Sequence, residues 1–205
     1  MLARRLQGTR SHLTVEGKRI PLLDRWHAQR FRGTKVQLLG RLGHGAMVGW
    51  AGVEWPASFY ALKRGEGCEM CRQGRPDETR WGVRFFAGRV SDAYLQRANI
   101  QRGYTVVVWR GRHVAEPTEL STTDASAYWL EVLRVAQALE TQLKPVKMNY
   151  NVLGNSLPHL HAHIIPRYAD DPRPGWPFPF PEHDPPPIDD HVLHEDVEAL
   201  RRLLA

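Results

Sequence analysis

Apolar residues along the chain follow two different periods, and the first of them predicts strands. Three short stretches, 83–90, 90–96 and 104–111, are rich in β-branched and aromatic residues and are separated by glycine or arginine. This composition favours an antiparallel meander. The stretches 146–153 and 159–166 have the same character, so they predict two further strands.

The second period is helical and lies between these groups of strands. Apolar residues three or four positions apart predict a buried stripe on a helix that ends near Leu143, before Pro145. The stripe comprises Trp129, Leu130, Leu133, Ala136 and Leu139. Its first turn has three candidate caps, Thr122, Thr123 and Asp124. The order of elements predicts an α+β fold, in which one long helix packs on an antiparallel sheet of about five strands.

The two ends of the chain differ from its centre. Residues 1–54 mix basic residues with glycine and show little periodicity, which predicts an extension. The centre, 55–170, holds the predicted sheet and opens with a short helix that ends near Gly65. Residues 171–205 begin with a proline-rich run, typical of an extended arm, and end in a predicted short amphipathic helix.

Composition narrows the class of protein. The chain has 205 residues, of which 42% are hydrophobic and 24% are charged, as in a soluble protein with one domain of ordinary size. It lacks an apolar run of about 18 residues, and no apolar signal core follows the basic N-terminus, so we expect no membrane span and a cytoplasmic location. The net charge of +6 favours phosphate-bearing partners, although a solvated basic surface explains it equally well. Nucleic acid is permitted but not favoured, because no nucleic-acid-binding motif accompanies the basic residues.

Three histidines occupy alternate positions in the stretch NSLPHLHAHIIPRY, residues 155–168. In a strand, His159, His161 and His163 would share one face, while the apolar residues between them would pack beneath. Imidazole near neutral pH serves as a nucleophile, a hydrogen-bond donor or a metal ligand. The alternative is a polar strand face that happens to be rich in histidine.

Cys68 and Cys71 are the only cysteines and form one C-x-x-C motif. Without an export signal, this spacing indicates metal binding or redox chemistry rather than a structural disulfide. Redox motifs usually open a helix in a βαβ unit, and no such pattern surrounds this one. Zinc, which prefers four ligands, would need two more from elsewhere in the chain. A pair of reduced cysteines without metal is the remaining alternative.

The segment GNSLPHLHAHIIPRY resembles the signature of the histidine triad superfamily of nucleotide hydrolases and transferases. Upstream, GYTVVVWRGRHVAEPTELSTTDASA is similar to the strand, basic-histidine segment and helix start of that family. GEGCEMC is similar to the C-x-x-C that opens the domain in many bacterial members. Together the three segments cover about Ser58 to Tyr168. The resemblance therefore implies the same α+β fold, and the superfamily commonly forms two-fold dimers, so we expect a homodimer.

The resemblance also implies roles in catalysis. His161 would attack the α-phosphorus of a nucleotide and form a covalent nucleotidyl-histidine, which water or another acceptor then releases. His163 would donate a hydrogen bond to the phosphoryl oxygens. Ser156 matches the position that assists the leaving group or the phosphate. Tyr104 stands where a histidine is common in the family.

Four further residues are candidates for substrate binding, three of them through the resemblance to the family. Asn149 and Asn155 match polar positions near the phosphate, although ordinary turn chemistry explains the two asparagines nearly as well. Gln96 falls where an Asp or Asn usually holds the ribose hydroxyls. Arg167 is a candidate for the substrate phosphates, or else it marks the exit of the strand.

In zinc-bearing relatives the first histidine of the triad is a metal ligand. The resemblance thus implies a closed, structural Cys₂His₂ zinc site made of Cys68, Cys71, His113 and His159. With four protein ligands, no coordination position is left for substrate.

The implied function is hydrolysis of dinucleoside or nucleoside polyphosphates, or of nucleoside phosphoramidates. We expect the substrate to contain adenine. One alternative is a nucleotidyltransferase or phosphorylase that uses phosphate or a sugar phosphate as acceptor. Removal of adenylate from nucleic-acid ends is a second, but the zinc finger that usually accompanies it does not follow the triad here. The third is a zinc-stabilised module that binds nucleotides without turnover.

Overall fold

The computed structural model describes residues 12–15, 18–21, 54–181 and 185–205, and the chain divides into two compact units, 1–52 and 53–205. In the first unit, β1 (His12–Val15) pairs antiparallel with β2 (Lys18–Pro21). Most of the predicted extension lies outside the described residues. The fold below is that of the second unit.

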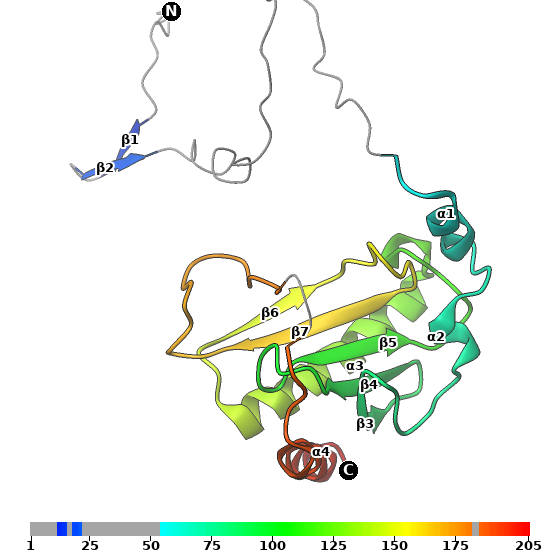
Figure 1. Ribbon diagram of the computed structural model, residues 1–205. Helices are drawn as coiled ribbons and strands as arrows, with labels where there is room; N and C mark the ends of the chain where they lie inside the picture. Colours follow the sequence, from blue (N-terminus) through cyan, green and yellow to red (C-terminus); the bar gives the residue numbers. More distant parts are fainter. Residues whose placement is uncertain (1–11, 16–17, 22–53, 182–184) are drawn as a thin grey trace, which may run out of the picture. The chain divides into compact units, whose positions relative to one another are not determined.

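A five-stranded antiparallel sheet forms the centre of this unit (Figure 1). Its strands are β3 (Gly82–Ala87), β4 (Ser91–Gln96), β5 (Thr105–Trp109), β6 (Lys147–Asn151) and β7 (His161–Arg167), in the order β3-β4-β5-β7-β6. The predicted sheet is confirmed. However, β7 begins two residues later than expected, so His159 precedes the strand instead of lying in it.

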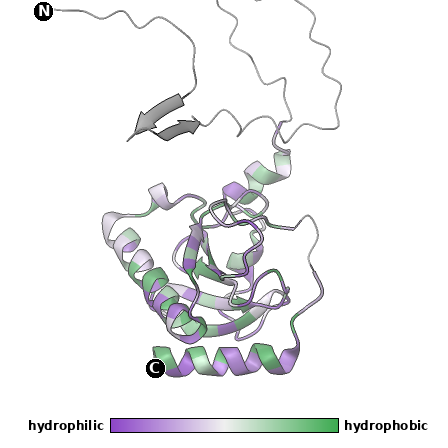
Figure 2. Ribbon diagram, turned by 90° about the vertical axis from the view of Figure 1, so that its left-hand side faces the viewer, coloured by the Kyte–Doolittle hydropathy of each residue, from purple (hydrophilic) through white to green (hydrophobic). Residues whose placement is uncertain are grey.

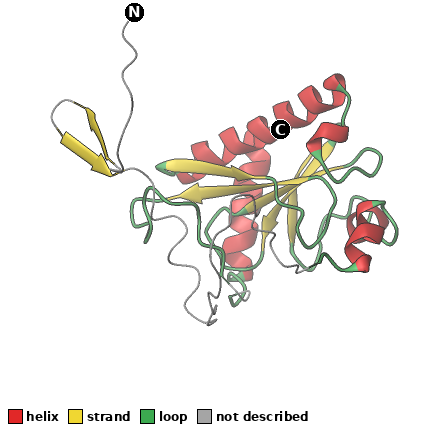
Figure 3. Cartoon of the chain, turned by 90° about the horizontal axis from the view of Figure 1, so that it is seen from above, coloured by secondary structure: helices red, strands yellow, loops and turns green. Residues whose placement is uncertain are grey.

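Helices complete the α+β fold. They are α1 (Ala57–Lys63), α2 (Glu69–Arg72), the 3₁₀ turn η1 (Pro117–Glu119), α3 (Thr122–Leu143) and α4 (Asp190–Leu204). The long helix α3 lies across one face of the sheet, and α4 packs against α3 and β3 (Figures 1 and 3). The α+β prediction is therefore confirmed. Among the described residues, no helix has the length and apolar character required to span a membrane.

The start and the buried face of α3 both differ from the prediction. Ser121 is the N-cap, because its hydroxyl accepts a hydrogen bond from the Asp124 amide at 3.1 Å. Leu130 and Leu133 are 67% and 50% exposed, so the predicted stripe was wrong there. The buried residues are Tyr128, Val132, Val135, Ala136, Ala138 and Leu139. Tyr128 is fully buried on this face, and its hydroxyl donates a hydrogen bond to the Val107 carbonyl at 2.9 Å.

The two faces of the sheet carry different clusters. Leu160, Ala162 and Ile164 are fully buried in the main core, together with residues of α3 and α4. The pattern of hydropathy along α4 in Figure 2 is that of an amphipathic helix, as predicted. The opposite face holds a smaller cluster made of Tyr94, Tyr104, Val106, Val108 and Ile165. The histidines of β7 share this second face.

The proline-rich arm, residues 171–189, is held at both ends. Near its start, the Arg167 guanidinium pairs with Asp171 and donates to the carbonyls of Arg173 and Trp176 at 3.1 and 3.0 Å. Near its end, the Ile188 amide donates to the Arg97 carbonyl at 2.7 Å. The described parts of the arm, 171–181 and 185–189, are therefore each tied to the domain by hydrogen bonds.

Candidate active site and metal cluster

A cavity of about 240 Å³ opens on the face of the sheet that carries the smaller cluster. Its floor comes from facing strands, because Val108 pairs with His161 and Val106 pairs with His163. Its walls come from α2, from the segment around Trp81 and from the loop before β7. The polar or charged lining residues are Glu69, Gln73, Thr79, Tyr94, Gln96, Tyr104, Arg110, Ser156, His161 and His163.

His161 is oriented by the main chain. Its Nδ1 lies 2.6 Å from the carbonyl oxygen of His159. A carbonyl oxygen only accepts hydrogen bonds, so Nδ1 carries the proton and donates. Burial lowers the pKa of His161, which favours the neutral ring. In that form the free lone pair is on Nε2, the atom that a nucleophilic imidazole uses.

His163 lies beside His161, with ring centroids 4.8 Å apart. The Nδ1 of His163 lies 2.6 Å from the Tyr104 hydroxyl, and the two rings stack at 5.8 Å. Burial lowers the pKa of His163 to about 4, so this ring is also neutral. Phe180 of the arm lies at its edge, with ring centroids 6.1 Å apart. The proline-rich arm therefore contacts the ring of His163 through Phe180.

Cys68, Cys71, His113 and His159 come together although up to 91 residues separate them in the chain. The Nδ1 of His159 lies 3.5 Å from the sulfur of Cys68 and 3.4 Å from that of Cys71. The Nδ1 of His113 lies 3.4 Å from the Cys71 sulfur. All four ligand atoms lie within 4.8 Å of one another.

The tautomers of both histidines suit metal binding. His159 donates from Nε2 to the Trp109 carbonyl at 2.8 Å, and His113 donates from Nε2 to the Lys63 carbonyl at 3.2 Å. Each neutral ring therefore turns an unprotonated Nδ1 toward the sulfurs. Burial lowers the pKa of His159 to about 4, which keeps that lone pair available. Sulfur and nitrogen ligands of one tetrahedral zinc ion lie about 3.6 Å apart. The cluster has the spacing and the donors that such an ion requires.

The structure brings two of the predicted substrate residues to the histidines. Ser156 and Gln96 both line the cavity. Asn155 instead lines a separate surface hollow beside α1. Asn149 and Arg167 bind each other at 2.6 Å and line a third hollow, beneath the proline-rich arm.

Arg167 has a physical reason to lie away from the cavity. Its buried guanidinium is engaged by Asp171, by two arm carbonyls and by Asn149. In this structure the contacts of Arg167 and Asn149 hold the arm, and neither residue lines the cavity of His161.

Other residues at the site were not singled out from the sequence. Asn151 pairs directly with His163 across β6 and β7 and is half-buried. It has the same strand face as Asn149, so the period of two was the signal that could have indicated it. Met70 and Arg110 also line the cavity, and their positions depend on contacts between distant segments.

Comparison with known proteins agrees with this geometry. The family model described as HIT domain matches residues 89–170. Residues 89–170 are similar to a HIT domain. The match includes β4, β5, α3, β6 and β7 with the whole triad, whereas Cys68 and Cys71 precede it. The proposed metal cluster thus joins a preceding segment to the HIT domain.

Solved HIT proteins share the fold. A histidine triad protein from Bradyrhizobium japonicum is 27% identical, with a TM-score of 0.53, and the match covers 60% of this chain and 91% of that one. A histidine triad protein from Marinobacter aquaeolei VT8 is 25% identical, with a TM-score of 0.54, over 60% and 88% of the two chains. Protein hit of Bacillus subtilis is 30% identical over 82 residues, which are 38% of this chain and only 56% of that protein.

Proposed function

We propose that the HIT domain hydrolyses the α-phosphate linkage of a nucleotide through a covalent nucleotidyl-histidine on His161. The observation that carries the proposal is the hydrogen bond from His161 Nδ1 to the His159 carbonyl at 2.6 Å. It leaves the Nε2 lone pair for attack, in a cavity that His163 and Ser156 also line. A neutral imidazole needs no separate base, and two displacement steps replace one difficult step.

The neighbouring side chains have defined tasks in this scheme. When the Tyr104 hydroxyl donates to Nδ1 of His163, Nε2 of His163 keeps its proton and donates to a phosphoryl oxygen. Ser156 would contact the leaving group or the phosphate, and Gln96 would contact the ribose. As the bond from His161 Nε2 to the α-phosphorus forms, the bond to the leaving group breaks and that group departs with its electron pair. Water then attacks the phosphorus, the Nε2–P bond breaks, and the water proton is released to the solvent, so His161 returns to its neutral form. Asn151, opposite His163, is an additional candidate for the phosphate.

We also propose that Cys68, Cys71, His113 and His159 hold a zinc ion. With four protein ligands the ion would be structural, and it would stabilise the joint between the C-x-x-C segment and the start of β7. The chain's own residues carry out the chemistry. A homodimer, an adenine base and a cytoplasmic location remain predictions from the sequence.

The experiment compares wild type with His161→Ala on diadenosine polyphosphates and on adenosine phosphoramidate. We expect hydrolysis by wild type and none by the variant, and mass spectrometry of rapidly quenched wild type should find a nucleotidyl adduct. His191→Ala is the matched control, because His191 is 77% exposed on α4. Equal turnover by wild type and His161→Ala would show that His161 is not the nucleophile. Binding of the nucleotide without turnover in wild type would support the module that only binds.

A further inference from the structure

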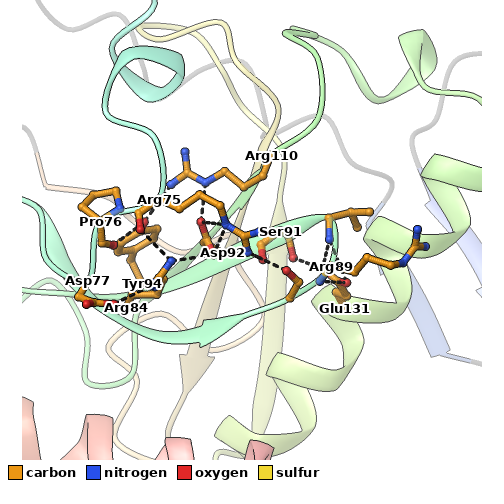
Figure 4. Close-up of polar contacts among 12 residues, drawn as sticks. Arg75, Pro76, Asp77, Arg84, Arg89, Ser91, Asp92, Tyr94, Arg110 and Glu131 are labelled. Carbon is orange, nitrogen blue, oxygen red and sulfur yellow. Dashed lines mark hydrogen bonds and ion pairs between the residues drawn. The ribbon is translucent and has the colours of Figure 1, made fainter.

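One buried carboxylate forms ion pairs with three guanidinium groups beside the cavity. Asp92 is fully buried on β4 and lies between Arg75, Arg84 and Arg110 (Figure 4). Its oxygens lie 2.7 Å from Arg75, 2.8 Å from Arg110 and 3.4 Å from Arg84. The exposed Asp77 neutralises Arg84 in addition. Three positive and two negative charges therefore meet here.

Of these three arginines, Arg110 is the one that reaches both sites. Its side chain is only 8% exposed, and each nitrogen of its fork has a different partner. Nε donates to Asp92 at 2.8 Å, one terminal nitrogen donates to the Met70 carbonyl at 3.0 Å, and the other donates to the Tyr94 hydroxyl at 2.9 Å. The planar guanidinium thus joins β4, which carries Asp92 and Tyr94, to α2, which carries Met70.

The two neutral partners belong to the two sites already described. Met70 lies between Cys68 and Cys71, so its carbonyl is part of the turn that presents both sulfurs. Met70 and Tyr94 also line the cavity of His161, and Met70 packs on the cluster that contains Tyr94 and Val108. The Tyr94 hydroxyl donates a hydrogen bond to the Pro76 carbonyl at 3.0 Å, which holds the segment after α2 in place.

Burial makes the Asp92 partner necessary. A guanidinium removed from water is costly unless a carboxylate compensates its charge and directs its donors. Asp92 meets that requirement from the adjacent strand, and its side chain is itself 0% exposed. The orientation of Arg110 therefore depends on Asp92 rather than on solvent or substrate.

We propose that Arg110, oriented by Asp92, is a positioning residue that couples the metal cluster to the nucleotide cavity. It holds the C-x-x-C turn through Met70 and the cavity wall through Tyr94. This inference rests on the proposed zinc site and nucleotide function but adds a residue to which neither assigns a role. Loss of the fork should weaken both sites at once, although Arg110 is a ligand of neither.

The predicted changes have a specific signature. Arg110→Gln should lower zinc affinity by about tenfold to a hundredfold, as expected for groups that orient metal ligands from outside the ligand sphere. The same variant should raise KM for the nucleotide several-fold, because Met70 and Tyr94 shape the cavity. In zinc-saturated samples its kcat should change by less than about twofold, because the His159 carbonyl still orients His161 there. Arg110→Lys keeps the charge but loses the planar fork, so its zinc affinity should lie between those of wild type and Arg110→Gln.

The experiment is competition for zinc between the full chain and a chromogenic chelator, with nucleotide binding measured by calorimetry on the same samples. Arg75→Gln is the matched control, since Arg75 loses the same charge and touches the same carboxylate but contacts neither Met70 nor Tyr94. We expect Arg75→Gln to retain the zinc and nucleotide affinities of wild type. If Arg110→Gln fails to fold, Arg110→Lys provides the comparison.

Each of the following outcomes would overturn the proposal. They are wild-type zinc affinity in both Arg110 variants, an equal loss of zinc affinity in Arg75→Gln, and a wild-type protein that binds no zinc. Failure of the proposed hydrolysis is distinguishable, since it would leave the chelator competition and the binding calorimetry unchanged. A loss of zinc affinity with unchanged nucleotide affinity would also contradict the coupling.

Discussion

The Nδ1 atom of His161 donates to the main-chain carbonyl of His159 at 2.6 Å, while the His159 ring points its own Nδ1 at Cys68 and Cys71. The proposed nucleophile is thus oriented by the backbone of a proposed metal ligand. Any change in the cluster that moves His159 also moves the acceptor that sets the tautomer of His161. Metal binding and catalysis should be linked through this bond.

Removal of the metal should therefore lower both stability and turnover. Chelation removes a ligand that binds only the folded chain, so the melting temperature falls. Cys71→Ser should have the same effect because it deletes one thiolate. Calorimetric melting measures the stability, steady-state kinetics measures the turnover, and elemental analysis measures the zinc content. Zinc content in Cys71→Ser equal to that of wild type would refute the ligand assignment.

Tyr104→Phe should lower kcat by about tenfold and change KM little. The hydroxyl that lies 2.6 Å from His163 Nδ1 is lost, and about 1.4 kcal/mol of orientation in the transition state is lost with it. Steady-state kinetics with adenosine phosphoramidate would measure the split. Tyr150→Phe on β6 is the control, since Tyr150 is 40% exposed. A rise in KM alone would contradict a role in orienting His163.

Arg167→Met should release the arm. The guanidinium loses Asp171, Asn149 and two arm carbonyls at once, so residues 171–181 become accessible to proteases. Limited proteolysis followed by mass spectrometry would locate the new cuts. In Arg173→Met the chain keeps the Arg173 carbonyl that Arg167 uses, so this control should resist cleavage like wild type. Equal resistance of Arg167→Met would show that other contacts hold the arm.

Tyr168 gives a prediction for alkaline pH. Burial raises its pKa from 10.0 to about 12, and its hydroxyl donates to the Arg102 carbonyl at 3.0 Å. The folded state therefore keeps the proton that the unfolded state loses, and wild type loses stability as the pH rises from about 10 to about 12.

Tyr168→Phe lacks this group, so its stability should not show that part of the decline. At pH 8 the variant should be less stable than wild type by about 1 kcal/mol, because one hydrogen bond is lost. Urea unfolding at pH 8 and pH 11 would measure whether the gap narrows. A gap that stays constant would show that folding does not raise the pKa of Tyr168.

The predictions from sequence succeeded where geometry is local. Alternation in and just before β7 placed Leu160, Ala162 and Ile164 in the core, and His161 and His163 on the other face. A period of two is a property of the extended backbone itself, so no tertiary information is needed. The same reasoning was less successful for α3, where two interleaved apolar stripes were available and only packing of the Tyr128 ring on the sheet selected one.

The sequence by itself determined the antiparallel sheet, the long helix and the shared face of His161 and His163, because periodicity and turn residues act over a few neighbouring positions. Resemblance to a family added Cys68, Cys71, His113 and His159 as one set, but their meeting within 4.8 Å is a result of the fold. Only the tertiary structure decided the partners of the arginines: Arg167 binds the arm, and Arg110 binds Asp92, Met70 and Tyr94. Long side chains choose among partners far apart in sequence, and that choice depends on which charges the packed chain buries together.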